Sequence, residues 1–486
     1  MSRCCPVEFS NGSRSWQMAD STIFAVTLRN PPRASSTRSA FRRSAMALTL
    51  VAAVVPGGAA YAGSSFELRT QSATTLGSAQ AGMTAEAADL TTMIFNPAAL
   101  AYGTGTEGAV GATVFRNSVQ FASTAATTVL GTPIPGNYGG NAGTTAGIPN
   151  VYVATELAKG VRFGLAISPR FGLGSYWSSG WVGRYYALDS ELTTIDLMPT
   201  ISFRADKTLS FGIGVDVQYA KIKTSSAIDF GTVDVLFTGG AFGGMPAGSD
   251  GLISSKADSW GIGWVVGMLY EPRPGTRIGF NYHSEIRQRL KGDASFDTGG
   301  PVGQGIAAVT GAFQNTSLNL NLVMPQSAAV GIYHDINATW AVMADVKWTG
   351  WNDLQILQLN FGNPLQSPAQ MSLAWRDTWF AAIGARYRVN DRVALRFGAA
   401  YDQSPTRDEA RNPVIPDSDS YWAAIGLEYR FSPSIKIDLA YGHVFTKNAP
   451  ITLSATGADN TFRGNLSGTL RDSYVDYLAL QLVYKF

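Results

Sequence analysis

Residues 209–220 read LSFGIGVDVQYA, and every second side chain in this stretch is large and apolar. The apolar series is Leu209, Phe211, Ile213, Val215, Val217 and Tyr219. Small or polar residues such as Gly212, Asp216 and Gln218 lie between them. Because side chains along a β-strand point alternately to opposite faces, this period of two predicts a strand with one continuous apolar face.

The same alternation recurs along the chain, over residues 260–270, 278–285, 340–348, 392–401 and 421–431. Several of these apolar faces begin or end with Trp or Tyr, as in the aromatic girdles of membrane β-barrels. Beyond residue 62 no apolar run approaches the roughly 18 residues of a membrane-spanning helix. A spanning chain without such helices must close its strands into a barrel to pair its backbone groups. We therefore expect an all-β transmembrane barrel, with a soluble β-sandwich as the alternative.

Short polar turns alternate with long loops rich in Gly, Ser, Thr and Pro. The turns are at 158–160, 205–207, 272–275, 335–337, 390–391 and 432–434, and the loops cover about 123–148, 171–189, 225–257, 292–317, 350–371, 403–417 and 447–470. Six turns and seven loops predict fourteen antiparallel strands over residues 106–486, the first near 106–121 and the last over 471–486. An even strand count with short periplasmic turns is typical of bacterial outer-membrane barrels. The terminal Phe486 resembles the signal read by the barrel-assembly machinery, although an ordinary last strand would look the same.

Residues 1–62 have the features of a secretion leader that is cleaved near Ala62. Arg38, Arg42 and Arg43 precede the apolar run 45–55, and Ala60-Tyr61-Ala62 resembles a signal-peptidase site. The alternative is a buried helix, because the run is too short to span a bilayer. This segment also contains both cysteines, so no disulfide framework or thiolate metal site is expected after it.

The charge balance argues against a nucleic-acid partner. Charged residues make up only 15% of the chain, against about 25% in typical soluble domains. The formal net charge is +2, but residues 1–62 contain seven Arg and two acidic residues, so the remainder is at −3. Partners are instead expected to be outer-membrane lipid and a small ligand, with no cofactor. We predict a monomer because a closed barrel has no free edge strand.

Residues 63–105 precede the first strand and are neither alternating nor helical throughout. We predict that they form an N-terminal hatch, a plug inside the lumen, which fourteen strands leave wide enough to hold one. The segments Phe66-Glu67-Leu68, 77–82 and 95–100, the last with Asn96-Pro97-Ala98, resemble the hatch of the FadL/TodX family of outer-membrane transporters for hydrocarbons and long-chain fatty acids. Further likeness lies at 169–199 and 210–214, and it extends over nearly the whole chain after residue 62.

The resemblance implies a mechanism in three steps. Ligand is captured in a groove among the outer loops, moves to a lumen site beside Phe66 and Leu68, and leaves sideways through a kink in the third strand. The third strand is expected over 161–170, and Pro169 is the candidate kink, although it could equally end the strand. The candidate groove residues are Trp177, Trp181, Tyr185, Tyr186, Phe237 and Phe242.

A fatty-acid ligand would need a cation for its carboxylate, because a buried unpaired charge is costly. Strand phase places several cations in the lumen, and the candidates are Arg277, Lys347, Arg386 and Arg396. Most of them are expected to pair with lumen acids such as Asp345, Glu428 and Asp438. Arg184 is expected to form a local ion pair with Asp189 and Glu191.

Uptake of long-chain fatty acids is the favoured function, with neutral aromatic hydrocarbons as the close alternative. A general porin is a distant alternative, because a hatch would block free diffusion. An outer-membrane lipase is also distant, since the chain lacks a Gly-x-Ser-x-Gly elbow and a His-Glu-x-x-His motif. Of its histidines, His283 is expected to face the lumen and His334 to lie at a turn. We therefore expect no enzymatic activity.

Overall fold

The computed structural model describes residues 65–457 and 459–486 of the chain. The leader predicted over residues 1–62 lies outside the described residues. Among the described residues, no helix is both long and apolar enough to cross a membrane.

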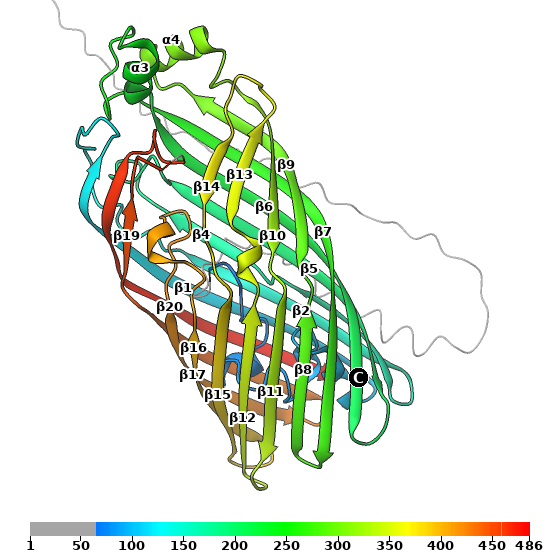
Figure 1. Ribbon diagram of the computed structural model, residues 1–486. Helices are drawn as coiled ribbons and strands as arrows, with labels where there is room; N and C mark the ends of the chain where they lie inside the picture. The colour runs from blue at the N-terminus through cyan, green and yellow to red at the C-terminus, as the bar shows by residue number, and fades with distance from the viewer. Residues whose placement is uncertain (1–64, 458) are drawn as a thin grey trace, which may run out of the picture. The chain divides into compact units, whose positions relative to one another are not determined.

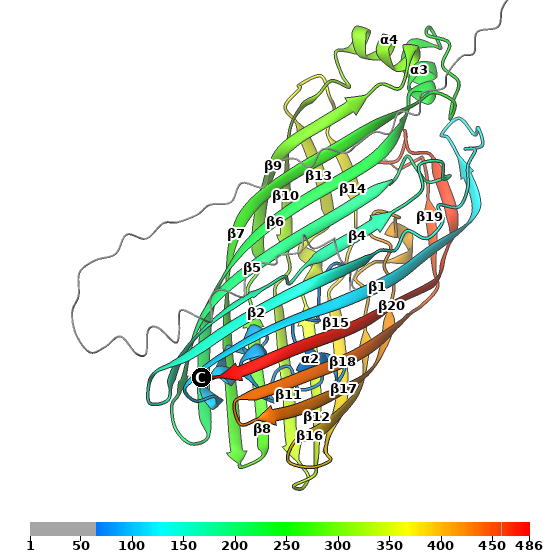
Figure 2. The same cartoon turned by 180° about the vertical axis from the view of Figure 1, so that it is seen from behind.

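Fourteen antiparallel strands form a closed barrel (Figures 1 and 2), which confirms the predicted fold class and strand count. In order around the wall they are β1 (Thr106–Thr127), β2 (Thr145–Ala158), β3 (Val161–Ser168), β5 (Asp189–Arg204), β6 (Leu209–Asp229), β7 (Asp250–Arg273), β8 (Thr276–His283), β11 (Ser327–Asp335), β12 (Trp340–Thr349), β15 (Thr378–Arg388), β16 (Val393–Asp402), β17 (Ser420–Ser432), β18 (Ile435–Thr446) and β20 (Asn465–Lys485). The wall closes where β1 pairs with β20, in the register Glu107↔Lys485.

Six shorter strands continue the wall at the end opposite the C-terminus. They are β4 (Gly172–Tyr176), β9 (Ile286–Asp297), β10 (Thr316–Met324), β13 (Ile356–Phe361), β14 (Ala369–Ser372) and β19 (Ala449–Leu453). The same end carries α3 (Phe230–Thr238) and α4 (Pro301–Thr310) (Figure 1). The short helices η4 (Trp351–Asp353) and η5 (Asp408–Ala410) lie in the connections between β12 and β13 and between β16 and β17. The segments predicted as long loops therefore contain more regular structure than their Gly and Pro content indicated. Neighbouring strands supply the hydrogen bonds that order them, as in the β7–β9 and β10–β13 pairings.

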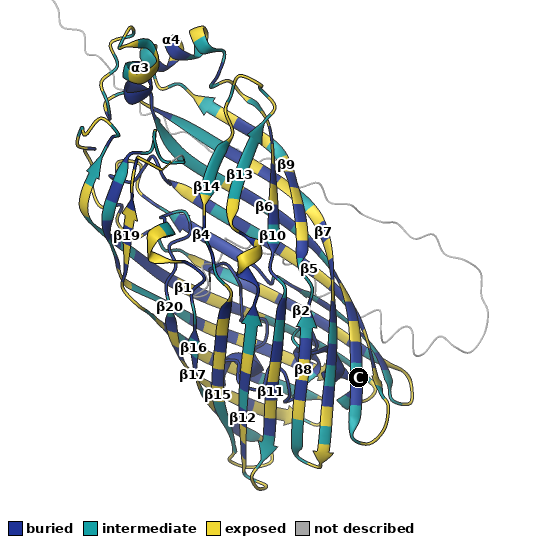
Figure 3. Cartoon of the chain, in the orientation of Figure 1, coloured by how far each residue is buried: buried dark blue, intermediate teal, exposed yellow. Residues whose placement is uncertain are grey.

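The alternating sequence pattern appears in the barrel as an alternation of burial (Figure 3). On β6, Ile213 and Val215 are 56% and 45% exposed on the outer face, whereas Asp216 is buried toward the lumen. Trp260, Ile262 and Trp264 continue this apolar outer face on β7. The pattern in residues 209–220 thus separates an apolar outer surface from a polar interior, which is the reverse of a soluble protein.

Candidate functional site

The segment between residue 65 and β1 lies inside the ring of strands (Figures 1 and 2). It contains α2 (Ala73–Leu76), η2 (Leu90–Ile94) and η3 (Pro97–Tyr102), and nearly all of its side chains are buried. Wall glycines make room for it. A Cβ on Gly212 of β6 would lie 2.4 Å from the carbonyl carbon of Pro97, and one on Gly426 of β17 would lie 2.8 Å from the Cα of Gly77. We refer to residues 65–105 as the hatch.

Asn96, Pro97 and Ala98 form the start of η3 and connect it to the wall. The side-chain oxygen of Asn96 accepts a hydrogen bond from the backbone N–H of Ala98 at 3.0 Å. Its amide nitrogen donates to the carbonyl oxygens of Thr84 at 2.7 Å and Met268 of β7 at 3.2 Å. Pro97 occupies the first helical position, where a missing N–H costs nothing. The motif therefore shapes the hatch locally and attaches it to β7.

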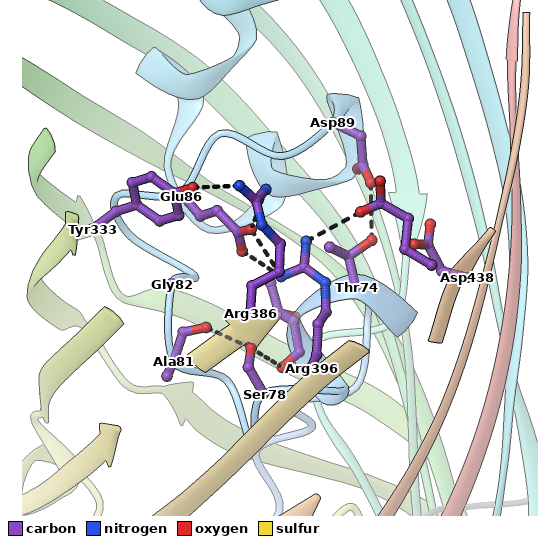
Figure 4. A network of polar contacts seen from close by, with 12 residues as sticks. Thr74, Ser78, Ala81, Gly82, Glu86, Asp89, Tyr333, Arg386, Arg396 and Asp438 are labelled. Carbon is purple, nitrogen blue, oxygen red and sulfur yellow. Dashed lines mark hydrogen bonds and ion pairs between the residues drawn. The ribbon is translucent and has the colours of Figure 1, made fainter. Parts of the chain in front are cut away.

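Buried ion pairs hold the lower part of the hatch to the wall (Figure 4). The carboxylate of Glu86 lies 2.8 Å from the guanidinium of Arg396 and 3.7 Å from that of Arg386. Arg396 also lies 3.5 Å from Glu428. Asp89, which caps η2 through the N–H of Thr91, pairs with Lys436 at 2.5 Å. These charges are buried together and compensate one another, so removal of one member would leave its partner uncompensated.

The N-terminal end of the hatch pairs with a break in the wall. β3 ends at Ser168, Pro169 follows it, and β4 begins only at Gly172. Along this stretch the hatch supplies the hydrogen bonds. The N–H of Leu68 donates to the carbonyl of Arg170 at 2.9 Å, and the N–H of Gly172 donates to the carbonyl of Phe66 at 2.8 Å.

The neighbouring strand β2 does not fill this break. It pairs with β3 only as far as Val151↔Ile167, and its remaining residues pair with β1. Among the described residues, β4 pairs as a strand with β5 alone. The three hatch residues 66–68 therefore pair with the continuation of the third strand, on the side where β2 would otherwise have paired.

An apolar cavity lies next to Phe66. Its empty volume is about 1010 Å³, counting the space that is open to solvent. The walls include Leu173, Ile222, Leu320, Leu322, Leu359 and Met371. Phe66 is 2% exposed, and its ring lies 4.8 Å from that of Trp351 and 5.7 Å from that of Trp375, measured between centroids. A ligand here would contact aliphatic side chains and the rings of Phe66 and Tyr186, and burial of apolar area is favourable by roughly 25 cal/mol per Å².

One cation lines this cavity without an anionic partner. Arg463 lies in the connection between β19 and β20, and its guanidinium is 6.0 Å from the ring centroid of Tyr186. Within the described part of the chain, no carboxylate lies within 4.0 Å of it and its side chain makes no hydrogen bond. Burial lowers the pKa of Arg463, because the apolar surroundings disfavour the charged form, and the nearby Tyr186 and Asp459 only partly offset this effect. The acidic residue that lines the cavity, Glu191, is paired with Lys223 at 3.0 Å.

Sequence reasoning missed Arg463. Strand phase selects lumen cations only within alternating segments, and residues 454–464 form a loop with no such phase. The sequence contains only a weak indication of this site, because Arg463 lies between two segments whose apolar residues face inward. Only the folded loop directs it toward the cavity.

The four predicted carboxylate partners lie elsewhere and are engaged. Lys347 pairs with Glu67, and Arg396 and Arg386 pair with Glu86. Arg277 donates from Nε to the carbonyl of Ala85 at 3.0 Å, and its guanidinium lies 4.3 Å from the ring centroid of Tyr333. None of the four lines the cavity at Phe66.

The acidic side chains of the lumen are bound by cations of the wall or by backbone groups of the hatch. Glu428 and Asp438 pair with Arg396 and Lys436, respectively. Asp345 instead accepts hydrogen bonds from hatch N–H groups, including that of Thr84 at 3.0 Å. The ion pair predicted for Arg184 with Asp189 and Glu191 is wrong. Arg184 pairs with Asp250 at 2.6 Å, because residues 181–187 fold against the start of β7 rather than along β5.

The predicted outer-loop groove residues divide into buried and exposed sets. Trp177 and Trp181 are stacked with centroids 4.3 Å apart, and both are at most 5% exposed, so neither ring faces an outer groove. Tyr185 is likewise buried, and Tyr186 lines the cavity at Phe66. Phe237 on α3 is 66% exposed, and Phe242 lies partly buried beside α3 and α4. A groove role remains a prediction for these last two.

A closed barrel of fourteen strands with a chain segment packed in its lumen defines the class of plugged outer-membrane channels. Residues 53–486 match the family described as outer membrane protein transport protein (OMPP1/FadL/TodX), and the chain belongs to this family. It is an outer-membrane protein that transports hydrophobic compounds. In the described residues, no group of three or more His, Cys, Asp or Glu side chains could hold a metal ion.

Relatives of known name and structure are similar over most of the chain. The chain is 27% identical over 440 residues to the long-chain fatty acid transport protein of Escherichia coli (strain K12), a match that covers 86% of this chain and 94% of that protein. A FadL homologue from Pseudomonas aeruginosa has a TM-score of 0.80 at 27% identity and covers 87% of this chain and 100% of that one. The Pseudomonas putida toluene transporter TodX has a TM-score of 0.63 at 20% identity, again with 87% and 100% covered, and this likeness concerns the fold alone.

Proposed function

We propose that the protein takes up long-chain fatty acids and that Arg463 binds their carboxylate. The observation that carries this proposal is a guanidinium on the wall of an apolar cavity that has no carboxylate of the described residues within 4.0 Å, while the acid on the same wall, Glu191, is paired with Lys223. An ionised acid with a long alkyl chain complements both features, because the chain fills the apolar space and the carboxylate pairs with the cation. The name of the relative from Escherichia coli (strain K12) supports the same substrate class.

Release would occur sideways, at the break after Pro169. The ligand in the cavity contacts Phe66, whose carbonyl accepts a hydrogen bond from Gly172 across that break. Withdrawal of residues 66–68 from the wall would leave the stretch between β3 and β4 without its backbone partner. Movement of this short segment would therefore connect the cavity to the outside of the barrel without unfolding the rest of the hatch.

Neutral aromatic hydrocarbons are the second candidate. The observation that favours them is the pair of aromatic rings on the cavity wall, Phe66 and Tyr186, with Trp351 and Trp375 packed against Phe66. Such rings bind a planar hydrocarbon without any charged group. In this case Arg463 would have no part in affinity.

The deciding experiment compares oleate with oleyl alcohol, which has the same chain and no carboxylate. Arg463→Gln in the purified full chain is expected to weaken oleate binding about tenfold or more, since a charge-assisted contact is lost, and to leave oleyl alcohol unchanged. Arg407→Gln is the matched control, because Arg407 is an exposed outer-loop arginine that does not line the cavity. Equal affinities of Arg463→Gln and wild type for oleate would contradict the role of Arg463.

Cells that lack their own transporter and express the protein provide the functional readout. They are given labelled oleate and labelled toluene in parallel. Oleate uptake that falls with Arg463→Gln supports the fatty-acid proposal. Uptake of toluene alone would assign the neutral hydrocarbon class, and uptake of neither by correctly folded barrels would refute both.

A further inference from the structure

The outer face of the barrel has a shallow apolar hollow that lies apart from the lumen. It crosses β11, β12, β15, β16 and β17, and alanines form its floor. Register places Ala344, Ile383, Ala399 and Ala423 side by side on successive strands, with Ile332 of β11 at one end of the row. Elsewhere the outer face carries larger side chains, as at Trp260, Ile262 and Trp264. Three of these five side chains are alanines, so the surface that faces the membrane is lowered on both sides of the projecting Ile383, which is 67% exposed.

The row climbs from the periplasmic end of the barrel toward its middle. Ile332 lies near Asp335, the periplasmic end of β11, whereas Ala423 lies near Ser420, the outer end of β17. This slope follows from barrel geometry, because strands tilt by about 35–45° and rows of paired residues run across them. A lipid tail lying in the hollow would therefore begin at the periplasmic boundary and rise into the membrane.

The lower end of the hollow is polar and basic. Arg273, Thr276 and His334 line it. The hydroxyl of Thr276 lies 3.1 Å from Nε of Arg273 and 2.9 Å from Nδ1 of His334, so the three side chains form one connected group. Within the described residues no carboxylate lies within 4.0 Å of Arg273, which is exposed. The terminal nitrogens of its guanidinium make no hydrogen bond to the described chain and can bind an anion.

The depth of this basic group matches that of a lipid headgroup. Trp340 and Tyr387, whose ring centroids are 4.7 Å apart, lie on β12 and β15 below the alanine row, at the periplasmic ends of these strands. Tyr270 lies at the corresponding end of β7 and is 42% exposed. Aromatic residues at this level mark the lipid–water interface of membrane barrels. Arg273 and His334 are thus at the height of phosphate groups, and the hollow above them is at the height of acyl chains.

We propose that this hollow is a binding site for one glycerophospholipid of the periplasmic leaflet of the outer membrane. Its phosphate binds Arg273 and His334, and one acyl chain lies along Ala344, Ala399 and Ala423. The charge of the phosphate complements the basic group at the rim, and the tail packs on the alanines and against the side of Ile383. The site is independent of the lumen cavity and of the proposed fatty-acid substrate, because it shares no lining residue with that cavity.

Two variants test the two halves of the site in the purified full chain. Ala399→Leu with Ala423→Leu fills the hollow, and Arg273→Gln with His334→Gln removes the basic group. Ala112→Leu on β1 is the matched control for the first, since Ala112 is an exposed outer-face alanine away from the hollow. Lys207→Gln, at the turn between β5 and β6, is the control for the second. Heat-modifiable migration on electrophoresis verifies that each variant has folded.

The measurement is native mass spectrometry of delipidated protein titrated with palmitoyl-oleoyl phosphatidylglycerol, and with the diacylglycerol of the same chains. Wild type and both controls are expected to retain one phospholipid. The charge variant is expected to bind it about tenfold more weakly, and the filled variant to bind neither lipid specifically. Retention of phosphatidylglycerol at wild-type affinity by either test variant would overturn the proposal, as would equal binding of the diacylglycerol to wild type.

Discussion

The lower and upper parts of the lumen differ in how their charged side chains are paired. Around residues 70–105 the cations of the wall are paired, as Arg396 is with Glu86 and Lys436 with Asp89. Beside Phe66 the wall is aliphatic, and Arg463 faces it with no carboxylate of the described residues within reach. A buried charge that is paired within the protein serves to hold structure, whereas one without a partner is available to a ligand. The difference supports the proposal that the upper cavity binds the ligand, while the lower hatch is held to the wall by ion pairs.

The largest expected effect comes from locking the short segment that lies between these two regions. Glu67 and Phe171 face each other as a non-hydrogen-bonded antiparallel pair. Their Cα atoms are expected about 4.5 Å apart, which suits a disulfide. Oxidised Glu67→Cys/Phe171→Cys protein should show no oleate uptake, and added reductant should restore it. The chain beyond residue 62 has no other cysteine to interfere.

The reduced double variant is the control for the loss of Glu67 and Phe171 themselves. Uptake that is the same before and after oxidation, with the disulfide confirmed by mass spectrometry, would show that residues 66–68 need not leave the wall. Binding of oleate to the oxidised protein should persist, because the lock acts on release.

Breaking the anchor should be costly but should leave the binding chamber in place. Arg396→Met leaves the buried Glu86 with only the more distant Arg386, at 3.7 Å, so the cost should approach the roughly 3–5 kcal/mol of a fully broken buried pair without reaching it. We expect a lower free energy of unfolding in urea and increased ion conductance in planar bilayers as the hatch loosens. Arg287→Met is the matched control, because Arg287 and Glu285 form an exposed pair that contributes little. Unchanged conductance of Arg396→Met would contradict an anchoring role.

The smallest effect concerns pH in the loop above the cavity. Burial raises the pKa of Asp417, in the connection between β16 and β17, to about 8. A carboxyl whose pKa is raised on folding stabilises the fold at low pH, and this stability is lost as pH rises through about 8. Asp417→Asn should therefore protect the loop at pH 9 relative to wild type and change little at pH 3, where the carboxyl is neutral both in the closed loop and after the loop opens. Hydrogen exchange of residues 403–419 at both pH values measures this, and equal protection at pH 9 would be the contrary result.

The predictions from sequence succeeded where a local pattern has one structural solution. The alternation in residues 209–220 and its repeats indicated strands with an apolar outer face. The number of turns and loops predicted fourteen strands. The regular structure inside the predicted loops, such as β9 and β13, was missed because its hydrogen bonds come from strands distant in sequence. The partner of Arg184 was predicted wrongly for the same reason: it is Asp250, which is distant in sequence, and not Asp189 or Glu191.

By itself, the sequence determined the class of fold, the direction of the strands and the residues that could plug the lumen, because these depend on side-chain period and turn composition. Tertiary structure alone decided which charges meet. Glu86 and Arg396 are separated by 310 residues, and Arg69 and Asp402 by 333. Such pairs form only once the barrel has closed around the hatch. The same closure places Arg463 at the apolar cavity, where no carboxylate of the described residues lies within 4.0 Å of it. This position could be found only from the folded chain.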